Sequence, residues 1–592
     1  MQSRRAWVGA LVLSAMLATA AQWAPIAWRL QGHHGGYYGD VDEQFYAALV
    51  RRAAQAPLTT TDPFDVQWRH AASPYGVLLP RLLGLPDRLG APPGAWSDLS
   101  RWLGSGASAW LLIRLGTEAA SPAVGAAAAT LTLLDPGSYY GKPLLRLATG
   151  RWEPATEAQQ LPMSRLFTPG YLLPFYLAAL LVLLRAVGPR GGAGSGTGGR
   201  GRDAGSRRWV AILAFAAVGL AGYFFFWTAA LAAAVAVAVL HPRRRALRRW
   251  VVPALVAMVI GVLLNGLGGH DDPVQHALRL GFVRTRRPQF LLHAGYWAGA
   301  VVAAWLALGR YRGRSGARAL GLAAVGIWAL VLLMSPLTGW DPQAHHYNMA
   351  LDPAVTLVWC TAAWYAWRRL RRPGLGLPRA AAAGAAAAGV SLAAFLGPTL
   401  AMRGLAAAPR LDWGGARQLA ADARVGPTAQ VAVPRSERYA LGLTLPNTPY
   451  WYPYDEAWGV SDTALFNRTV CAALITGEDS TATSLLATPR QEAATVWPDG
   501  RPAGVSVAGR RDYFSLMPVL ADSEAAAVGA LGRDPAALRA RCRALPGYAL
   551  AEGRPEVRRA AAVAAALGGA PAWVAPDSGR AWFRFPSAAG SP

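Results

Sequence analysis

The chain has 592 residues, of which 53% are hydrophobic and only 15% are charged, and its formal net charge is +25. A soluble chain of this length usually carries more charge, so the composition argues against a soluble protein. The basic residues are spread over separate short segments without interleaved aromatic side chains, which argues against a nucleic-acid-binding groove.

Repeated apolar segments of about 17–25 residues are long enough to cross a bilayer core, and they predict a polytopic α-helical membrane protein with about eleven spans. The second segment is the least apolar, because Asp98, Arg101 and Arg114 lie in or near it, and 74–90 is an alternative span or surface helix. In chain order the segments are 6–28, 97–116, 118–135, 168–187, 208–224, 226–241, 250–268, 289–309, 319–336, 350–367 and 380–402.

Arginine placement predicts the orientation of these spans. With a cytoplasmic N-terminus, every predicted inner loop contains arginine, and the acidic residues there are only Glu118 and Asp203. Short cytoplasmic loops are enriched in basic residues, so the high net charge reflects topology. We therefore expect a multi-pass protein of the bacterial inner (cell) membrane, with 6–28 retained as an anchor and the C-terminus outside.

The chain divides into a transmembrane domain, 1–403, and an extracytoplasmic domain, 404–592. Large outer loops are expected at 29–96 and 136–167. The C-terminal part mixes helical and strand patterns, which predicts an α/β domain. Helices are expected at 414–423, 461–476, 523–531, 534–543 and 558–567, and strands at 429–433, 572–574 and 581–585.

Two of the three cysteines, Cys471 and Cys542, lie in the C-terminal domain. An extracytoplasmic compartment permits a disulfide between them. The alternative is a pair of buried thiols, and the sequence does not separate the two.

An acidic segment with Asp40, Asp42 and Glu43 follows the first apolar segment. A carboxylate at the membrane surface can act as a general base, and Asp40 and Asp42 are the candidate catalytic residues. Alternatively, one of them caps a helix that begins near Glu43. Glu43 fits the first turn of that helix, so it is kept only as a residue that could line the site.

Arginines in the predicted outer loop 269–288 break the usual charge bias, and arginine matches phosphate oxygens well. They are candidate ligands of a lipid phosphate, or else part of a surface helix that contacts lipid headgroups. Arg165, in the loop 136–167, is a weaker candidate of the same kind. The set in the loop 269–288 is Arg279, Arg284, Arg286 and Arg287.

His345 and His346 precede the tenth span, with Asp341 and Asn348 on either side. These residue types could hold a divalent cation such as Mg²⁺ or Mn²⁺. A plain surface position is the alternative, and nothing in the sequence shows that this loop meets the others.

The anchor span, the acidic outer loop, the many spans and the outer C-terminal domain together resemble the GT-C superfamily of integral membrane glycosyltransferases. The segments Arg165–Pro169 and Gln343–Tyr347 also look like segments of uncharacterised bacterial members. The resemblance implies a donor sugar linked to a polyprenyl phosphate, and it matches Asp40 or Asp42 to the catalytic acid of the first loop. The C-terminal domain contains no WWD-type oligosaccharyltransferase signature.

The resulting hypothesis is a glycosyltransferase (EC 2.4 class) that moves a sugar to an extracytoplasmic lipid, glycan or protein. Its partners would be membrane lipid, the lipid-linked donor and the acceptor, with no nucleic acid. A transporter or lipid flippase is a second hypothesis, although the predicted spans contain few acidic residues. A non-catalytic envelope assembly protein with a GT-C-like fold is a third.

Overall fold

The computed structural model describes most of the helical part of the chain and much of the C-terminal part. The described residues are 2–31, 47, 50, 78–90, 95–134, 170–187, 200–242, 244–266, 283–284, 286, 294–309, 315–341, 344–370, 421, 430–434, 448–449, 462–478, 526–542 and 545–586.

Helices occupy each predicted apolar segment up to residue 370, and 380–402 lies outside the described residues. Within 74–90 the described helices are the short α4 (Leu78–Leu83) and α5 (Leu85–Arg88). The long helices are α1 (Gln2–Ala21), α6 (Ala95–Ala119), α7 (Pro122–Leu134), α10 (Leu173–Val187), α11 (Arg200–Ala221), α12 (Phe224–Leu240), α13 (Arg244–Gly266), α15 (Ala294–Leu308), α16 (Ser315–Thr338) and α17 (Asn348–Leu370).

The first apolar segment is not the single helix that the sequence predicts. It is divided at Gln22 into α1 and a second helix, α2 (Trp23–Leu30). Pro25 has no backbone N–H, so it cannot donate the helical hydrogen bond to the carbonyl of Ala21. The break therefore falls where that bond would have formed.

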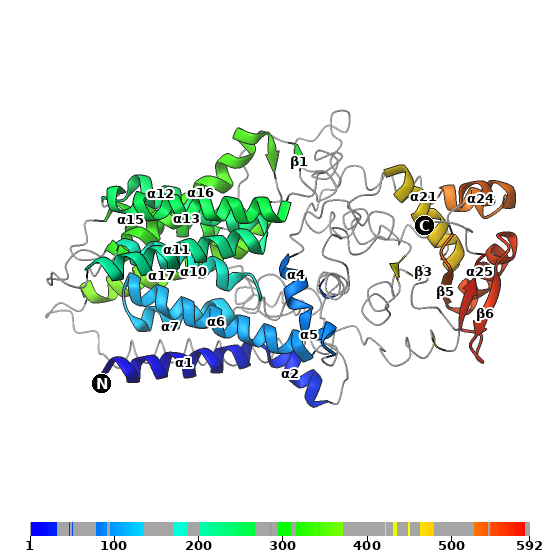
Figure 1. Cartoon of the computed structure of the whole chain (residues 1–592), viewed down its shortest axis with the longest axis horizontal. Helices are drawn as coiled ribbons and strands as arrows, with labels where there is room; N and C mark the ends of the chain where they lie inside the picture. Colours follow the sequence, from blue (N-terminus) through cyan, green and yellow to red (C-terminus); the bar gives the residue numbers. More distant parts are fainter. Residues whose placement is uncertain are drawn as a thin grey trace.

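The helices form an up-and-down bundle with two distinct ends. At one end the carboxyl termini of α6 and α10 meet, where Arg185 Nε lies 3.2 Å from Glu118 Oε1. The Tyr365 hydroxyl of α17 donates to the Ala119 carbonyl there. The opposite end, where α2 ends and α6 begins, is the first-loop end. Figure 1 shows α2, α5 and β1 (Val283–Arg284) at that end, with the α/β part of the chain beyond it.

Small residues let the helices approach closely. A Cβ added to Gly219 of α11 would collide with the backbone of Met258 in α13, and one added to Gly261 would meet the backbone of α11. Close contacts through small residues are characteristic of helix packing in lipid, where burial of apolar surface provides little driving force.

Outward-facing side chains of the bundle are also apolar. On α13 the residues Val252, Val256, Val259, Ile260 and Leu263 are all exposed and lie on one helical face. A continuous exposed apolar face is unusual for a protein surrounded by water. By length and hydropathy, α16 is the one described helix that could cross a membrane unaided, and several other apolar helices are shorter.

The C-terminal part contains a five-stranded sheet in the order β4-β3-β5-β7-β6. The first three strands of that order are parallel, and β7 is antiparallel to both of its neighbours. The strands are β3 (Gln430–Ala432), β4 (Thr448–Pro449), β5 (Tyr548–Glu552), β6 (Ala570–Val574) and β7 (Arg580–Arg584).

Helices α21 (Asp462–Thr476), α24 (Pro535–Arg541) and α25 (Arg554–Ala566) accompany this sheet. Ala549, Ala551 and Phe583 of the sheet share a hydrophobic core with Val470 and Ala560 of α21 and α25. Leu550 and Trp582, which face the other side of the sheet, are also buried. The expected mixture of helix and strand is therefore present, and the boundary near residue 404 remains a prediction.

One of the two outer strands of this sheet, β6, is largely exposed, and it has an irregular register between Pro571 and Trp573. Proline has no N–H to offer a further strand.

A disulfide joins Cys471 in α21 to Cys542, which follows α24, with a Cα–Cα distance of 5.7 Å. Both cysteines are buried. Cys360 in α17 is the free cysteine. The disulfide resolves the alternative that the sequence leaves open. Structural disulfides are typical of oxidising compartments, so it also favours an extracytoplasmic location for this part of the chain.

We predict that Cys542→Ser lowers the stability of the C-terminal part by about 2–4 kcal/mol, because a cross-link over 71 residues restricts the unfolded chain. Thermal unfolding of the purified full-length protein, with and without reductant, measures the effect. Cys360→Ser is the matched control and should change little. Titration of the denatured, unreduced protein should find one thiol, and three reactive thiols would contradict the disulfide.

Candidate functional site

The structure joins two predicted outer loops that the sequence could not connect. Strand β1 (Val283–Arg284) pairs antiparallel with β2 (Trp340–Asp341), with Val283 opposite Asp341 and Arg284 opposite Trp340. The arginine-rich loop and the segment that leads to the histidine pair are therefore held together by backbone hydrogen bonds. This small ladder is the core of the candidate site.

The turn before β2 directs the chain out of α16. Gly339 has a φ of +77°, a conformation that favours glycine. The Thr338 hydroxyl donates to the Met334 carbonyl at 2.7 Å, and it accepts from the Trp340 N–H at 3.1 Å. Arg286 is exposed, and its Nε lies 4.0 Å from where a Cβ of Gly339 would be. The guanidinium group of Arg286 is thus beside this turn and accessible to an anion.

The histidine pair lies in a 3-10 helix, η3 (Ala344–Tyr347), directly before α17. His346 stacks on Phe225 of α12, with ring centroids 4.9 Å apart and an interplanar angle of 22°. Tyr347 is buried, and its hydroxyl lies 2.8 Å from Thr228 Oγ1. These contacts fix η3 against α12 at the first-loop end. The structure describes only the backbone of His345.

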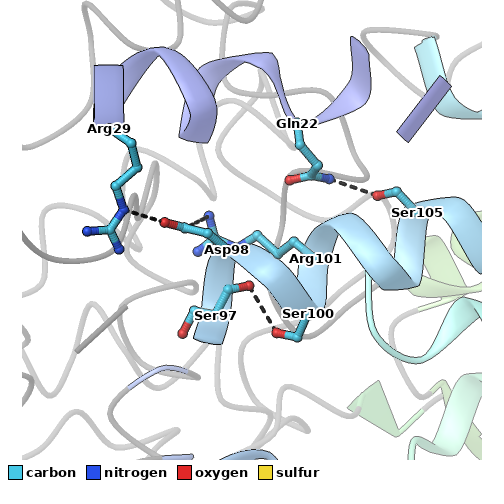
Figure 2. Close-up of polar contacts among 7 residues, drawn as sticks. All are labelled: Gln22, Arg29, Ser97, Asp98, Ser100, Arg101 and Ser105. Atoms are coloured by element: carbon cyan, nitrogen blue, oxygen red, sulfur yellow. Dashed lines mark hydrogen bonds and ion pairs between the residues drawn. The ribbon is translucent and has the colours of Figure 1, made fainter. Parts of the chain in front are cut away.

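A second polar cluster lies at the same end, between α2 and α6 (Figure 2). Arg29 Nε is 2.6 Å from Asp98 Oδ2, and Arg101 Nη1 is 3.8 Å from Asp98 Oδ1. Arg101 is fully buried. Gln22 Nε2 donates to Ser105 Oγ at 2.8 Å. A carboxylate beside two guanidinium groups makes a directional contact.

Asp40, Asp42 and Glu43 lie outside the described residues, but the chain on both sides of them is described. Before them, α2 ends at Leu30 and the chain is described to Gln31. After them, Ala47 and Val50 are helical and buried, at 5% and 7% exposure. Val50 belongs to the hydrophobic core of the bundle. The described chain therefore belongs to the bundle both before and after the acidic segment.

The structure describes the other predicted site residues only in part. Arg165, Arg279 and Arg287 lie outside the described residues, and Arg284 is described by its backbone in β1. Among the residues that the structure describes, no group of three or more histidine, cysteine, aspartate or glutamate side chains could hold a metal ion. The divalent cation thus remains a prediction that depends on the undescribed side chains of Asp341 and His345.

Sequence reasoning missed the contribution of Arg29, Gln22 and Tyr347. A signal was present for the cluster around Asp98, because Asp98 and Arg101 interrupt an otherwise apolar segment. Ionisable residues in such positions usually face the protein interior and pair with one another. No comparable signal marked Tyr347, whose partner Thr228 is distant in sequence.

No protein-family model matches the chain, and no curated protein matches it. Structural comparison pairs it with the apo oligosaccharyltransferase of Archaeoglobus fulgidus, at 14% identity and a TM-score of 0.49, over 80% of this chain and 67% of that one. The oligosaccharyltransferase AglB from Archaeoglobus fulgidus, in complex with an inhibitory peptide and a dolichol-phosphate, gives 13% identity and a TM-score of 0.47, over 80% of this chain and 67% of that one.

ArnT from Cupriavidus metallidurans bound to undecaprenyl phosphate matches at 14% identity and a TM-score of 0.49, over 100% of this chain and 99% of that one. These proteins are GT-C glycosyltransferases, the class that the sequence resemblance predicts. Likeness at this level of score and identity assigns neither family nor activity to this chain.

Proposed function

We propose that this chain is a membrane glycosyltransferase of the GT-C type, which moves a sugar from a polyprenyl-phosphate-linked donor to an extracytoplasmic acceptor. The observation that carries the proposal is the β1–β2 ladder. It pairs part of the arginine loop with the segment that leads to the histidine pair, at the end of the bundle where α2 ends before the acidic segment. This arrangement supports a site at that end, in which the acidic segment would supply the base.

The membrane setting rests on the surface of the bundle. Exposed apolar faces on α1 and α13 (Trp7, Leu11, Val256 and Ile260 among them) suit contact with lipid tails. A lipid-linked donor would present its phosphate at the bilayer surface. In the proposed orientation, the first-loop end lies at the outer surface, and the disulfide of the C-terminal part fits the same compartment.

The chemistry is an inverting displacement at the anomeric carbon of the donor sugar. Asp40 or Asp42 takes the proton from the acceptor hydroxyl or amide as the new bond forms to that carbon. The bond from the carbon to the phosphate oxygen breaks, and the polyprenyl phosphate leaves with the electron pair. Arg284 and Arg286 stabilise the negative charge that develops on it. The region 404–592 shapes the acceptor site.

We predict that Asp40→Asn or Asp42→Asn abolishes transfer, because an amide cannot accept the proton. A positioned base typically contributes about 10²- to 10⁴-fold to the rate. Mass spectrometry of envelope glycans, in a strain that depends on this gene, measures the loss. Glu43→Gln is the control and should retain transfer, since Glu43 fits the first turn of a helix. Normal glycans in both aspartate variants would exclude the catalytic role.

We also predict that Arg286→Gln weakens binding of a polyprenyl phosphate by about tenfold, the loss of one charge-assisted hydrogen bond of roughly 1.4 kcal/mol. Titration of undecaprenyl phosphate into the purified protein in lipid nanodiscs measures the dissociation constant. Arg208→Gln removes an exposed arginine from α11 near the opposite end of the bundle and should leave binding unchanged. Equal affinities in the two variants would contradict a phosphate role for Arg286.

A further inference from the structure

The α2–α6 contact has the geometry of a two-point clamp. Gln22 contacts Ser105, and Arg29 contacts Asp98. Gln22 and Arg29 are seven positions apart in sequence, and so are Asp98 and Ser105. Seven positions correspond to about two turns of an α-helix. Asp98 and Ser105 therefore share one face of α6. Gln22 lies at the break before α2 and Arg29 in the last turn of α2, so the two contacts set α2 antiparallel to α6, as Figure 2 shows.

The two points of the clamp differ in strength and direction. The Gln22–Ser105 bond is neutral, whereas Arg29 and Asp98 are oppositely charged and only 2.6 Å apart. Side-chain exposure is 31% for Arg29 and 18% for Asp98, so the pair is partly shielded from water. On the other side of the carboxylate lies Arg101, with a fully buried side chain that belongs to the same helix as Asp98. The charged point fixes the last turn of α2 most firmly.

That last turn is the last described helical turn before the acidic segment. Asp40 follows nine residues after Gln31, the last described residue before it, and Glu43 precedes buried Ala47 by four residues. The anchor after the acidic segment is the apolar burial of Ala47 and Val50, which is non-directional. The charged contact before it is directional, because the guanidinium group and the carboxylate each have a fixed plane.

We propose that Asp98 and Arg29 are positioning residues, which set the direction in which the first outer loop leaves α2 and thereby place the catalytic carboxylate. The inference rests on the proposed function, and neither residue touches substrate. Misplacement of a reacting group by about 1 Å can cost about a hundredfold in rate. Loss of the contact should therefore reduce turnover more than donor binding.

The test compares Arg29→Gln, Arg29→Lys and Asp98→Asn with Arg185→Gln. Arg185 forms a similar interhelical pair with Glu118, 3.2 Å apart, at the opposite end of the bundle. Transfer is measured in membrane vesicles over a range of extracted lipid-linked donor. In Arg29→Gln we expect kcat to fall by about tenfold or more, with donor KM within about twofold. Arg29→Lys should retain most of the transfer rate. Arg185→Gln should transfer sugar at the rate of the unsubstituted protein.

Arg29→Gln is the principal variant, because Asp98 then keeps Arg101 as a partner and the protein should still fold. A second readout does not require activity. Spin labels at Gln31→Cys and Val301→Cys, in a Cys360→Ala background, report the distance from the end of α2 to the exposed face of α15. The distribution of this distance should broaden in Arg29→Gln and stay narrow in Arg185→Gln.

An unchanged kcat in Arg29→Gln would overturn the positioning role, whether or not the distance distribution broadens. An unchanged distance distribution in Arg29→Gln would show that the ion pair does not hold α2. That result would also overturn the positioning role. If the unsubstituted protein transfers no sugar, the proposed function fails separately, and the spin-label distances alone then decide whether the clamp exists.

Discussion

The alternating direction of the packed helices is the constraint on which the rest of this structure depends. Because successive long helices run up and down, every second connection emerges at the same end of the bundle. Contacts such as Arg29–Asp98 at one end and Arg185–Glu118 at the other define those ends. Chain segments that are hundreds of residues apart in sequence are thus brought to one surface, and β1 can pair with β2 there. A site assembled in this way needs no contiguous sequence motif.

Sequence patterns located most helices because apolar segments of this length have few alternatives. They also identified Asp534 and Pro535 as the start of a helix, and Asp534 Oδ1 accepts from the N–H groups of Ala536 and Ala537. The central strand β5 was missed. Its sequence, Tyr-Ala-Leu-Ala-Glu, favours a helix by local propensity, and only pairing with β3 and β7 on either side makes it a strand. The break at Gln22 was also missed, although Pro25 signalled it.

The candidate site could be predicted in its residue types but not in its arrangement. Exposed arginine in a predicted outer loop, and histidine beside aspartate, were visible as departures from the expected pattern. Their meeting depends on a two-residue ladder between positions 283–284 and 340–341, and strands this short carry no periodic signal. The stacking of His346 on Phe225 likewise depends on how α12 and α17 pack. Local propensity gives no information about such long-range contacts.

The exposed strand β6 has a consequence for the proposed membrane setting. An open sheet edge can recruit a strand from a neighbouring molecule, and copies confined to a bilayer would meet at high local concentration. Pro571 removes one donor from this edge, and the irregular register between Pro571 and Trp573 breaks its regular spacing. Pro571 and the irregular register after it therefore discourage edge-to-edge aggregation between copies of the protein.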